Sequence, residues 1–298
     1  YENSPKYHLF LIKQILDLEI LKKIVGKKNN NKNILLIKKG LNFILNISHP
    51  DKTLPFFNDT NRNYIKVDKI KKKFEIIFGD LGNFKFKNKI FPIIYNKQFK
   101  LITKCCEPSP KYNPGHTHGD NLSFELSILN KRILTGRGIS TYENNNDRKI
   151  QRSSKNHNSI EINGLSANEV WNSFRVARKS KISSLKISKN SIYAECLGYY
   201  HNFKFNVHKR KWILKNKNLQ ILDEVKNKDF KIYLNFTPET NVKYNNIENC
   251  YLIKNGNVKA KISFDSTKHS LKEFNYYEDF ENIKKFFLIE IFSKKNCN

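Results

Sequence analysis

The hydrophobic periodicity of this chain changes once along its length, and this change limits the folds that the chain can adopt. From Pro5 to about Asn46, apolar residues recur at steps of three and four, which is the pattern of amphipathic helices. Residues 48–64 contain two prolines and interrupt regular structure. From about Lys73 onward, short runs rich in Ile, Phe, Tyr and Val are separated by Asn, Gly, Lys and Asp, as in strands and turns. We therefore expect a mainly β protein, an antiparallel β-sandwich, with helices mostly before about Ser48.

The net charge of +28 on 298 residues points to a polyanionic partner: nucleic acid, anionic lipid or acidic polysaccharide. Lys, Asn and Ile are over-represented together, as in "GKKNNNKNILLIKKG", and the lysines form no single block. This distribution favours a coding bias spread over the whole surface as the main origin of the charge. A nucleic-acid binder would show a recognisable motif or a basic stripe, and the sequence has neither. We therefore expect no nucleic-acid partner.

Cysteines and apolar runs argue against two further classes of protein. The five cysteines show no CxxC or Cys/His spacing, so the sequence predicts neither a disulfide framework nor a structural zinc ribbon. No apolar run is long enough to cross a bilayer, so no membrane span is expected. The chain starts at Tyr1 inside what reads as a motif and contains no methionine, which favours a fragment of a longer protein.

Two histidines and an aspartate occur at strict two-residue spacing in "YNPGHTHGDNLSFELSIL". In an extended strand, His116, His118 and Asp120 would share one face, and the apolar residues from Leu122 to Ile128 would continue that face into a core. This pattern predicts a strand that carries its imidazoles at one end, where a groove can open.

Six blocks of sequence, taken together in their order, carry a resemblance to a known family. The chain resembles the heparinase II/III-like family of polysaccharide lyases, whose members combine an N-terminal α/α toroid with a C-terminal antiparallel β-sandwich. The resemblance implies that residues 1–65 are the last helices of the toroid and that residues 66–298 form the sandwich domain. The blocks are "YENSPKYH" (1–8), "PFFND" (55–59), "PGHTHGDNLSFELS" (114–127), "GISTYE" (138–143), "RSSKNHNSI" (152–160) and "WNSFRVARK" (171–179).

The chemistry that the resemblance implies is β-elimination at a uronic acid within an acidic polysaccharide, with a periplasmic or extracellular location. This reaction needs neutralisation of the carboxylate, a base for the carbon-bound proton and an acid for the leaving oxygen. In the family, a tyrosine of the helical domain faces the first histidine of the HxH motif, and the matching positions are Tyr7 and His116. We expect a sugar ring to fit between their side chains. From the residues alone, Tyr7 can also be an ordinary helix residue and His116 a histidine bonded to backbone.

Three residues are candidates for substrate binding. Arg152 offers a planar guanidinium that suits carboxylate or sulfate groups, and Asn158 can donate its amide to a sugar. His8 follows the candidate tyrosine and can either contact substrate or brace the helix. The family's residues that neutralise the carboxylate lie mostly upstream, so we expect the fragment alone to be inactive.

Zinc is the cofactor that the resemblance implies. In the family, the ion is often held by the second histidine of HxH, an aspartate on the following strand and the histidine of an "HN" motif. His118 and His157 match two of these positions, but the alignment of "ILTGRGISTYE" places Gly136 where the acid would stand. Asp120, on the same predicted strand face as His118, is the candidate to replace it as ligand or as a partner of a ligand. Without zinc, the two histidines would bond the groove floor or the sugar.

Three functional hypotheses follow from the sequence. The first is a lyase acting on an acidic glycan, and the second is a non-catalytic relative that binds or organises a surface polysaccharide. The glycine at position 136 supports the second hypothesis. The third, a nucleic-acid binder, rests on charge alone.

Overall fold

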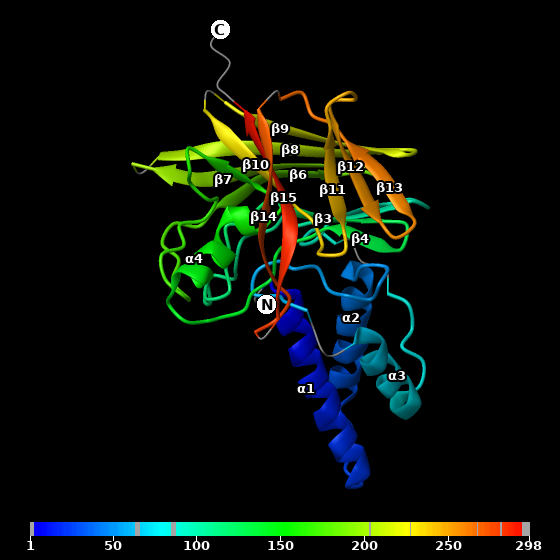
Figure 1. Ribbon diagram of the computed structural model, residues 1–298. Helices are drawn as coiled ribbons and strands as arrows, with labels where there is room; N and C mark the ends of the chain where they lie inside the picture. Colours follow the sequence, from blue (N-terminus) through cyan, green and yellow to red (C-terminus); the bar gives the residue numbers. More distant parts are fainter. Residues whose placement is uncertain are drawn as a thin grey trace.

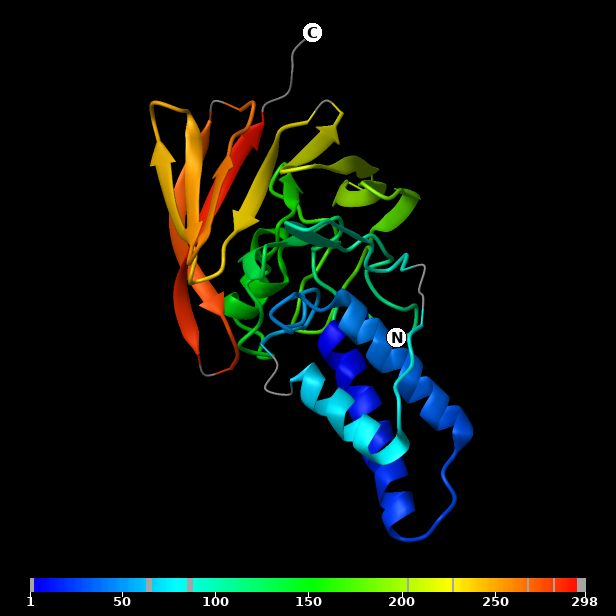
Figure 2. The same ribbon diagram turned by 90° about the vertical axis from the view of Figure 1, so that its right-hand side faces the viewer.

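The structure is a computed structural model that describes residues 3–62, 66–84, 88–202, 204–226, 228–266, 268–280 and 282–293. Three helices project from a larger body of short strands (Figure 1), and the view in Figure 2 shows that the helices stand side by side. All pairings between the named strands are antiparallel, which confirms the mainly β, antiparallel class. No helix in the described ranges has the length and apolar character needed to cross a membrane.

The helical unit consists of α1 (Pro5–Ile24), α2 (Asn31–Ile47) and α3 (Val67–Phe78). A proline in the first turn of α1 and the Asn30 side chain, which accepts from the Lys32 backbone N–H, mark two of the helix starts. The first two helices cross closely at Gly40, where an added Cβ would lie 2.3 Å from Ile12 Cδ1. Leucine, isoleucine and phenylalanine side chains from all three helices form one apolar cluster.

The third helix corrects the sequence prediction that helices lie mostly before Ser48 and that strands begin near Lys73. Its buried residues Val67, Ile70 and Phe74 are spaced three and four apart and pack in the same cluster as α1 and α2. The helical unit therefore extends past residue 65. A fourth, short helix, α4 (Asn146–Arg152), was not predicted either.

The strands form four small antiparallel sheets with the orders β1-β2-β3-β4, β14-β15-β10-β5, β11-β12-β13 and β6-β7-β8-β9. Strict alternation is clearest in β7, where Ile192, Ala194 and Cys196 are fully buried. Opposite Ile192 on β8 lies the buried Trp212. The strands are β1 (Ile93–Tyr95), β2 (Phe99–Thr103), β3 (Phe124–Ile128), β4 (Lys131–Leu134), β5 (Ile160–Ile162), β6 (Lys181–Ile187), β7 (Ser191–His201), β8 (Lys204–Lys215), β9 (Asn218–Val225), β10 (Phe230–Asn235), β11 (Asn241–Asn245), β12 (Cys250–Asn255), β13 (Val258–Ile262), β14 (His269–Tyr277) and β15 (Ile283–Ser293).

The segment that carries the two histidines is not a strand, which corrects a second prediction. Residues 112–123 form turns and coil, and β3 begins only at Phe124. Leu122 has a positive φ of 55°, so the chain turns sharply just before the strand. The alternation expected for His116, His118 and Asp120 therefore does not determine where their side chains point.

Residues 48–62 lie between α2 and α3 and contain no helix or strand of their own, as predicted from their prolines. The segment is anchored by buried polar contacts to β3. His49 Nε2 lies 2.8 Å from Glu125 Oε2, and the Phe56 backbone N–H donates to Glu125 Oε1 over 2.7 Å. These contacts hold the 48–62 segment, and with it the helical unit, against the sheets, and the candidate site lies where the helical unit and the sheets meet.

Candidate active site at the junction of helices and sheets

Tyr7 and His116 come from far apart in the sequence and meet at the junction. Tyr7 lies in the first turn of α1, and His116 lies in the coil before β3. Their rings stack with centroids 4.0 Å apart and planes inclined by 27°. The two side chains are therefore neighbours, as predicted, but they touch directly. The expectation that a sugar ring fits between them is wrong, because a stacked pair leaves no such gap.

Asp59 is the centre of the hydrogen-bond network behind this pair. Its carboxylate is fully buried and accepts from the Arg148 guanidinium, with Nη2 2.8 Å from Oδ2. The same carboxylate lies 2.7 Å from His116 Nδ1 and 2.8 Å from His118 Nε2. Burial alone would raise the pKa of Asp59, but the hydrogen bonds from Arg148 and the two imidazoles hold it well below its usual range. An ionised carboxylate only accepts, so Asp59 places a proton on each facing nitrogen.

Tyr142 adds a second phenol to the site. Its hydroxyl lies 2.8 Å from the Tyr7 hydroxyl, and its ring stacks on Phe174 with centroids 5.5 Å apart. Burial, and after it the negative charge of Asp59, raises the pKa of Tyr142 above its ordinary value. Tyr142 is therefore protonated at neutral pH and can donate to the Tyr7 oxygen. The half-exposed rings of Phe174 and Phe280 both contact the Tyr142 ring.

His118 and His157 converge as the zinc hypothesis requires of two ligands. His118 Nδ1 lies 3.0 Å from His157 Nε2, and both rings are buried. Burial lowers the pKa of His118 to about 4 and that of His157 to about 3, so both imidazoles are neutral above about pH 5. The His157 ring faces Gly136, where an added Cβ would lie 3.2 Å from Nδ1.

Asp120 does not join the two imidazoles. It forms a fully buried ion pair with Lys104, and its Oδ2 accepts from the Asn58 backbone N–H over 2.9 Å. Across the described part of the chain, no group of three His, Cys, Asp or Glu side chains is arranged to hold a metal ion. The donor set present is two neutral imidazoles, which falls short of the three or four protein ligands of zinc sites. The donor set in this structure therefore does not fit zinc. Zinc binding stays an untested prediction.

The three predicted substrate-binding residues face the protein interior. Arg152 is fully buried and donates from Nε over 2.9 Å to the carbonyl of Thr117, between the two histidines of HxH. Asn158 is also buried, and its side chain donates to the Phe124 carbonyl and accepts from the Asn235 backbone N–H. His8 packs against Phe43 of α2 with ring centroids 5.1 Å apart. Each of these side chains therefore contacts backbone groups or a neighbouring ring of the protein, and their role in substrate binding stays a prediction.

Four residues of the site were not assigned a role from the sequence: Asp59, Lys104, Tyr142 and Arg148. Asp59 and Tyr142 lie in the blocks "PFFND" and "GISTYE", so membership of these blocks was an available signal. Arg148 is one of four arginines among the matching blocks that the lysine bias does not explain, whereas Lys104 carries no local signal, because it is one among 55 lysines and arginines.

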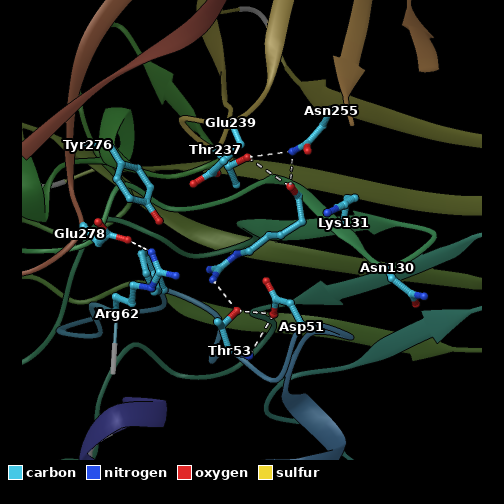
Figure 3. A pocket seen from close by; sticks show the side chains of 12 residues that line it. Asp51, Thr53, Arg62, Asn130, Lys131, Thr237, Glu239, Asn255, Tyr276 and Glu278 are labelled. Atoms are coloured by element: carbon cyan, nitrogen blue, oxygen red, sulfur yellow. Dashed lines mark hydrogen bonds and ion pairs between the residues drawn. The ribbon is translucent and has the colours of Figure 1, made fainter. Parts of the chain in front are cut away.

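A separate polar pocket of about 250 Å³ is lined in part by residues 51–62 (Figure 3). Carboxylates and cations both line it, and Figure 3 shows Glu278 paired with Arg62 on one side and Thr237 and Asn255 joined on the other. Tyr7 and His116 do not line this pocket. Its mixed charge gives it no preference for an anionic ligand.

A mainly β body joined to helices carries a tyrosine, a histidine and a buried carboxylate at their junction, an arrangement that can hold and transfer protons. Sequence comparison gives the family. The family model "Heparinase II/III-like, C-terminal" matches residues 78–288, and "Heparinase II/III N-terminus" matches residues 1–86. The chain belongs to the heparinase II/III-like family. Among curated protein sequences, none matches the chain.

Solved structures share the fold at low sequence identity. A heparinase III with methylated lysines superimposes with a TM-score of 0.77 at 18% identity, over 99% of this chain and 49% of that chain. Heparan sulfate lyase HepC from Pedobacter heparinus gives a TM-score of 0.74 at 17% identity, over 99% of this chain and 50% of that chain. This chain therefore spans about half the length of these structures.

Proposed function

We propose that the protein is a polysaccharide lyase that cleaves an acidic, uronic-acid-containing glycan by β-elimination. The observation that carries the proposal is the contact between Tyr7 and His116, with Asp59 bonded to the imidazole and Tyr142 to the phenol. Family membership and the net charge of +28 agree with an acidic polysaccharide as substrate. We also infer that α1 to α3 end an α/α toroid, that the sheets correspond to the family's sandwich, and that the protein works in the periplasm or outside the cell.

The network suggests how protons move. Asp59 keeps a proton on His116 Nδ1, so Nε2 is the nitrogen whose lone pair can take part in proton transfer. A hydrogen bond from protonated Tyr142 to the Tyr7 oxygen stabilises negative charge there, which favours the deprotonated form of Tyr7 that can accept the carbon-bound proton. Because Tyr7 and His116 are side by side, both approach the same face of a sugar. We therefore expect syn elimination, in which the carbon-bound proton and the leaving oxygen lie on one side of the ring.

Lys6 is the candidate in this chain for neutralising the uronate carboxylate. It precedes Tyr7, its Nζ lies 5.5 Å from the centre of the Phe280 ring, and it donates to Asn61 Oδ1 over 2.7 Å. Burial lowers the pKa of Lys6, and the negative charges of Asp59 and Asp279 oppose this effect. A uronate bound beside Lys6 would add a further negative charge and would favour the ammonium form of the Lys6 side chain.

The test is release of the unsaturated, ultraviolet-absorbing product from heparan sulfate, chondroitin sulfate and alginate, using the longest form of the protein that its coding sequence yields. We expect Tyr7→Phe and His116→Ala to lose roughly 10²–10⁴-fold in turnover, as for loss of a positioned proton-transfer group. Tyr7→Phe keeps the stacked ring and loses only the hydroxyl, so its glycan affinity should be unchanged. Full activity in Tyr7→Phe would refute the assignment.

The second candidate function is a non-catalytic relative that binds or organises a surface polysaccharide. Gly136, at a position where the family has an acid, is the observation that favours it. Glycan retardation in affinity electrophoresis without any unsaturated product from the unmutated protein would support this function. Binding to nucleic acid that survives moderate salt would support neither candidate.

A further inference from the structure

The polar cluster behind the candidate site contains two buried carboxylates, and each has a side-chain cation. Asp59 is paired with Arg148, and Asp120 is paired with Lys104. All four side chains are almost completely buried. A buried carboxylate without a counter-ion is strongly unfavourable, so these two cations account for the charge balance of the cluster.

The Lys104 ammonium is held by side-chain oxygens from two segments of the chain. Its Nζ donates to Asn58 Oδ1 over 2.6 Å and to Asp120 Oδ1. Backbone hydrogen bonds fix the residue in place, because Lys104 N–H donates to the Ser123 carbonyl and the Leu122 N–H donates to the Lys104 carbonyl. An ammonium group thus gathers oxygen atoms from the 48–62 segment and from the turn before β3.

In the His118–His157 pair beside Lys104, a donor and an acceptor can be assigned to each hydrogen bond without a metal ion. Ionised Asp59 requires the proton of neutral His118 on Nε2, so His118 Nδ1 accepts the proton of His157 Nε2. His157 Nδ1 is then the acceptor that faces Gly136, and it has no hydrogen-bond partner among the residues described here. A zinc ion between the rings would need a lone pair on each of the two facing nitrogens. In the present contact one of these nitrogens carries the proton that the other accepts.

Position 136 cannot supply the missing acid by a simple substitution. A Cβ there would lie 2.6 Å from the Phe56 carbonyl oxygen, so the backbone of the 48–62 segment would have to move. The nearest carboxylate of the turn is Asp120, and Lys104 neutralises it.

We propose that the Lys104 ammonium takes the place of a metal ion in this cluster, with Asp120 and Asn58 as its ligands, so that the protein folds and keeps its site without zinc. The proposal concerns the charge that holds the cluster together. It is independent of whether the protein is a lyase, and its test does not use enzymatic activity.

The first experiment measures metal content and metal response of the unmutated protein. After purification without added metal, elemental analysis should find far less than one zinc ion per chain. Thermal unfolding should give the same midpoint with a chelator and with excess Zn²⁺. One tightly bound zinc ion per chain, or a lower midpoint after chelation, would overturn the proposal whether or not any variant folds.

The second experiment removes the cation. Lys104→Met keeps the length of the side chain and leaves the Asp120 carboxylate buried without its counter-ion, so its unfolding midpoint should fall well below that of the unmutated protein. Lys104→Met/Asp120→Asn removes both charges and should recover part of this loss. A Lys104→Met protein as stable as the unmutated protein would also refute the proposal, because the ammonium would then not be what holds the cluster together.

Discussion

The helical unit and the β body of this protein are stabilised in different ways. On α1, Leu9, Ile12 and Leu16 are buried against α2, while Leu18 and Leu21 on the outer face are 49% and 58% exposed. The helical unit therefore depends on apolar packing and still exposes apolar surface. The β body encloses a network of buried ions and imidazoles in addition to its apolar core. The fully buried charges of the candidate site come from the 48–62 segment and the β body, while α1 contributes Tyr7, held by ring stacking and a hydroxyl contact, and the partly buried Lys6.

Removal of the Asp59 carboxylate should have the largest effect on stability. Asp59→Ala leaves the Arg148 guanidinium buried without its counter-ion, which typically costs about 3–5 kcal/mol. We expect a loss of this size in the free energy of unfolding, measured by urea titration and followed by tryptophan fluorescence.

Asp17→Ala on α1 is the matched control for Asp59→Ala. Asp17 pairs with Lys13 and Lys73 on the surface, with its side chain 33% exposed. A surface ion pair contributes at most about 1 kcal/mol, so this variant should be close to the unmutated protein. Equal losses in the two variants would contradict the contrast between the helical unit and the β body.

Acid should destabilise the protein through its buried imidazoles at a pH where its carboxylates are still ionised. Burial lowers the pKa of His118 to about 4 and that of His157 to about 3, and it also lowers the pKa of His49 and His208. Below pH ~6.5 the unfolded chain therefore binds protons that the folded protein excludes, and stability falls as pH falls. The expected loss is on the order of 2 kcal/mol for each of His118 and His157 between about pH 7 and pH 5.

Urea midpoints measured at these two pH values check this expectation. The depressed pKa values of Asp59 and Asp120 contribute stability that is lost only below about pH 4, where unfolded carboxylates begin to bind protons. A midpoint that stays constant down to pH ~5 and falls only below pH ~4 would show that the carboxylates dominate and that the imidazoles are protonated in the folded state.

Sequence patterns predicted this molecule well where neighbouring residues determine the structure. The first two helices, the irregular 48–62 segment and the antiparallel strands all follow from local periodicity and turn residues. Helix α3 was missed because its Ile and Phe residues are also typical of strands, and only packing on α1 and α2 decides for a helix. The meeting of Tyr7 and His116 was expected from the family resemblance.

The rest of the site depends on contacts between distant residues. The spacing of His116, His118 and Asp120 suggested one strand face, but Asp59 binds both imidazoles and Lys104 binds Asp120. These partners lie on other segments, and a lysine-rich sequence gives no means of selecting Lys104. A buried charge is compensated by whichever opposite charge the fold brings near it. The partner of a buried charge therefore cannot be predicted from the sequence of one segment.

The smallest effect is expected on the outer face of α1. Leu21→Gln changes a side chain that is 58% exposed, so the free energy of unfolding should change by no more than about 0.5 kcal/mol. Leu16→Ala, on the inner face of the same helix at 1% exposed, should cost about 2–5 kcal/mol because it leaves a cavity. Urea unfolding followed by circular dichroism at the helix band compares the two variants. A loss above about 1 kcal/mol for Leu21→Gln would mean that this face is covered in solution, and sedimentation velocity would then show whether a second copy of the chain covers it.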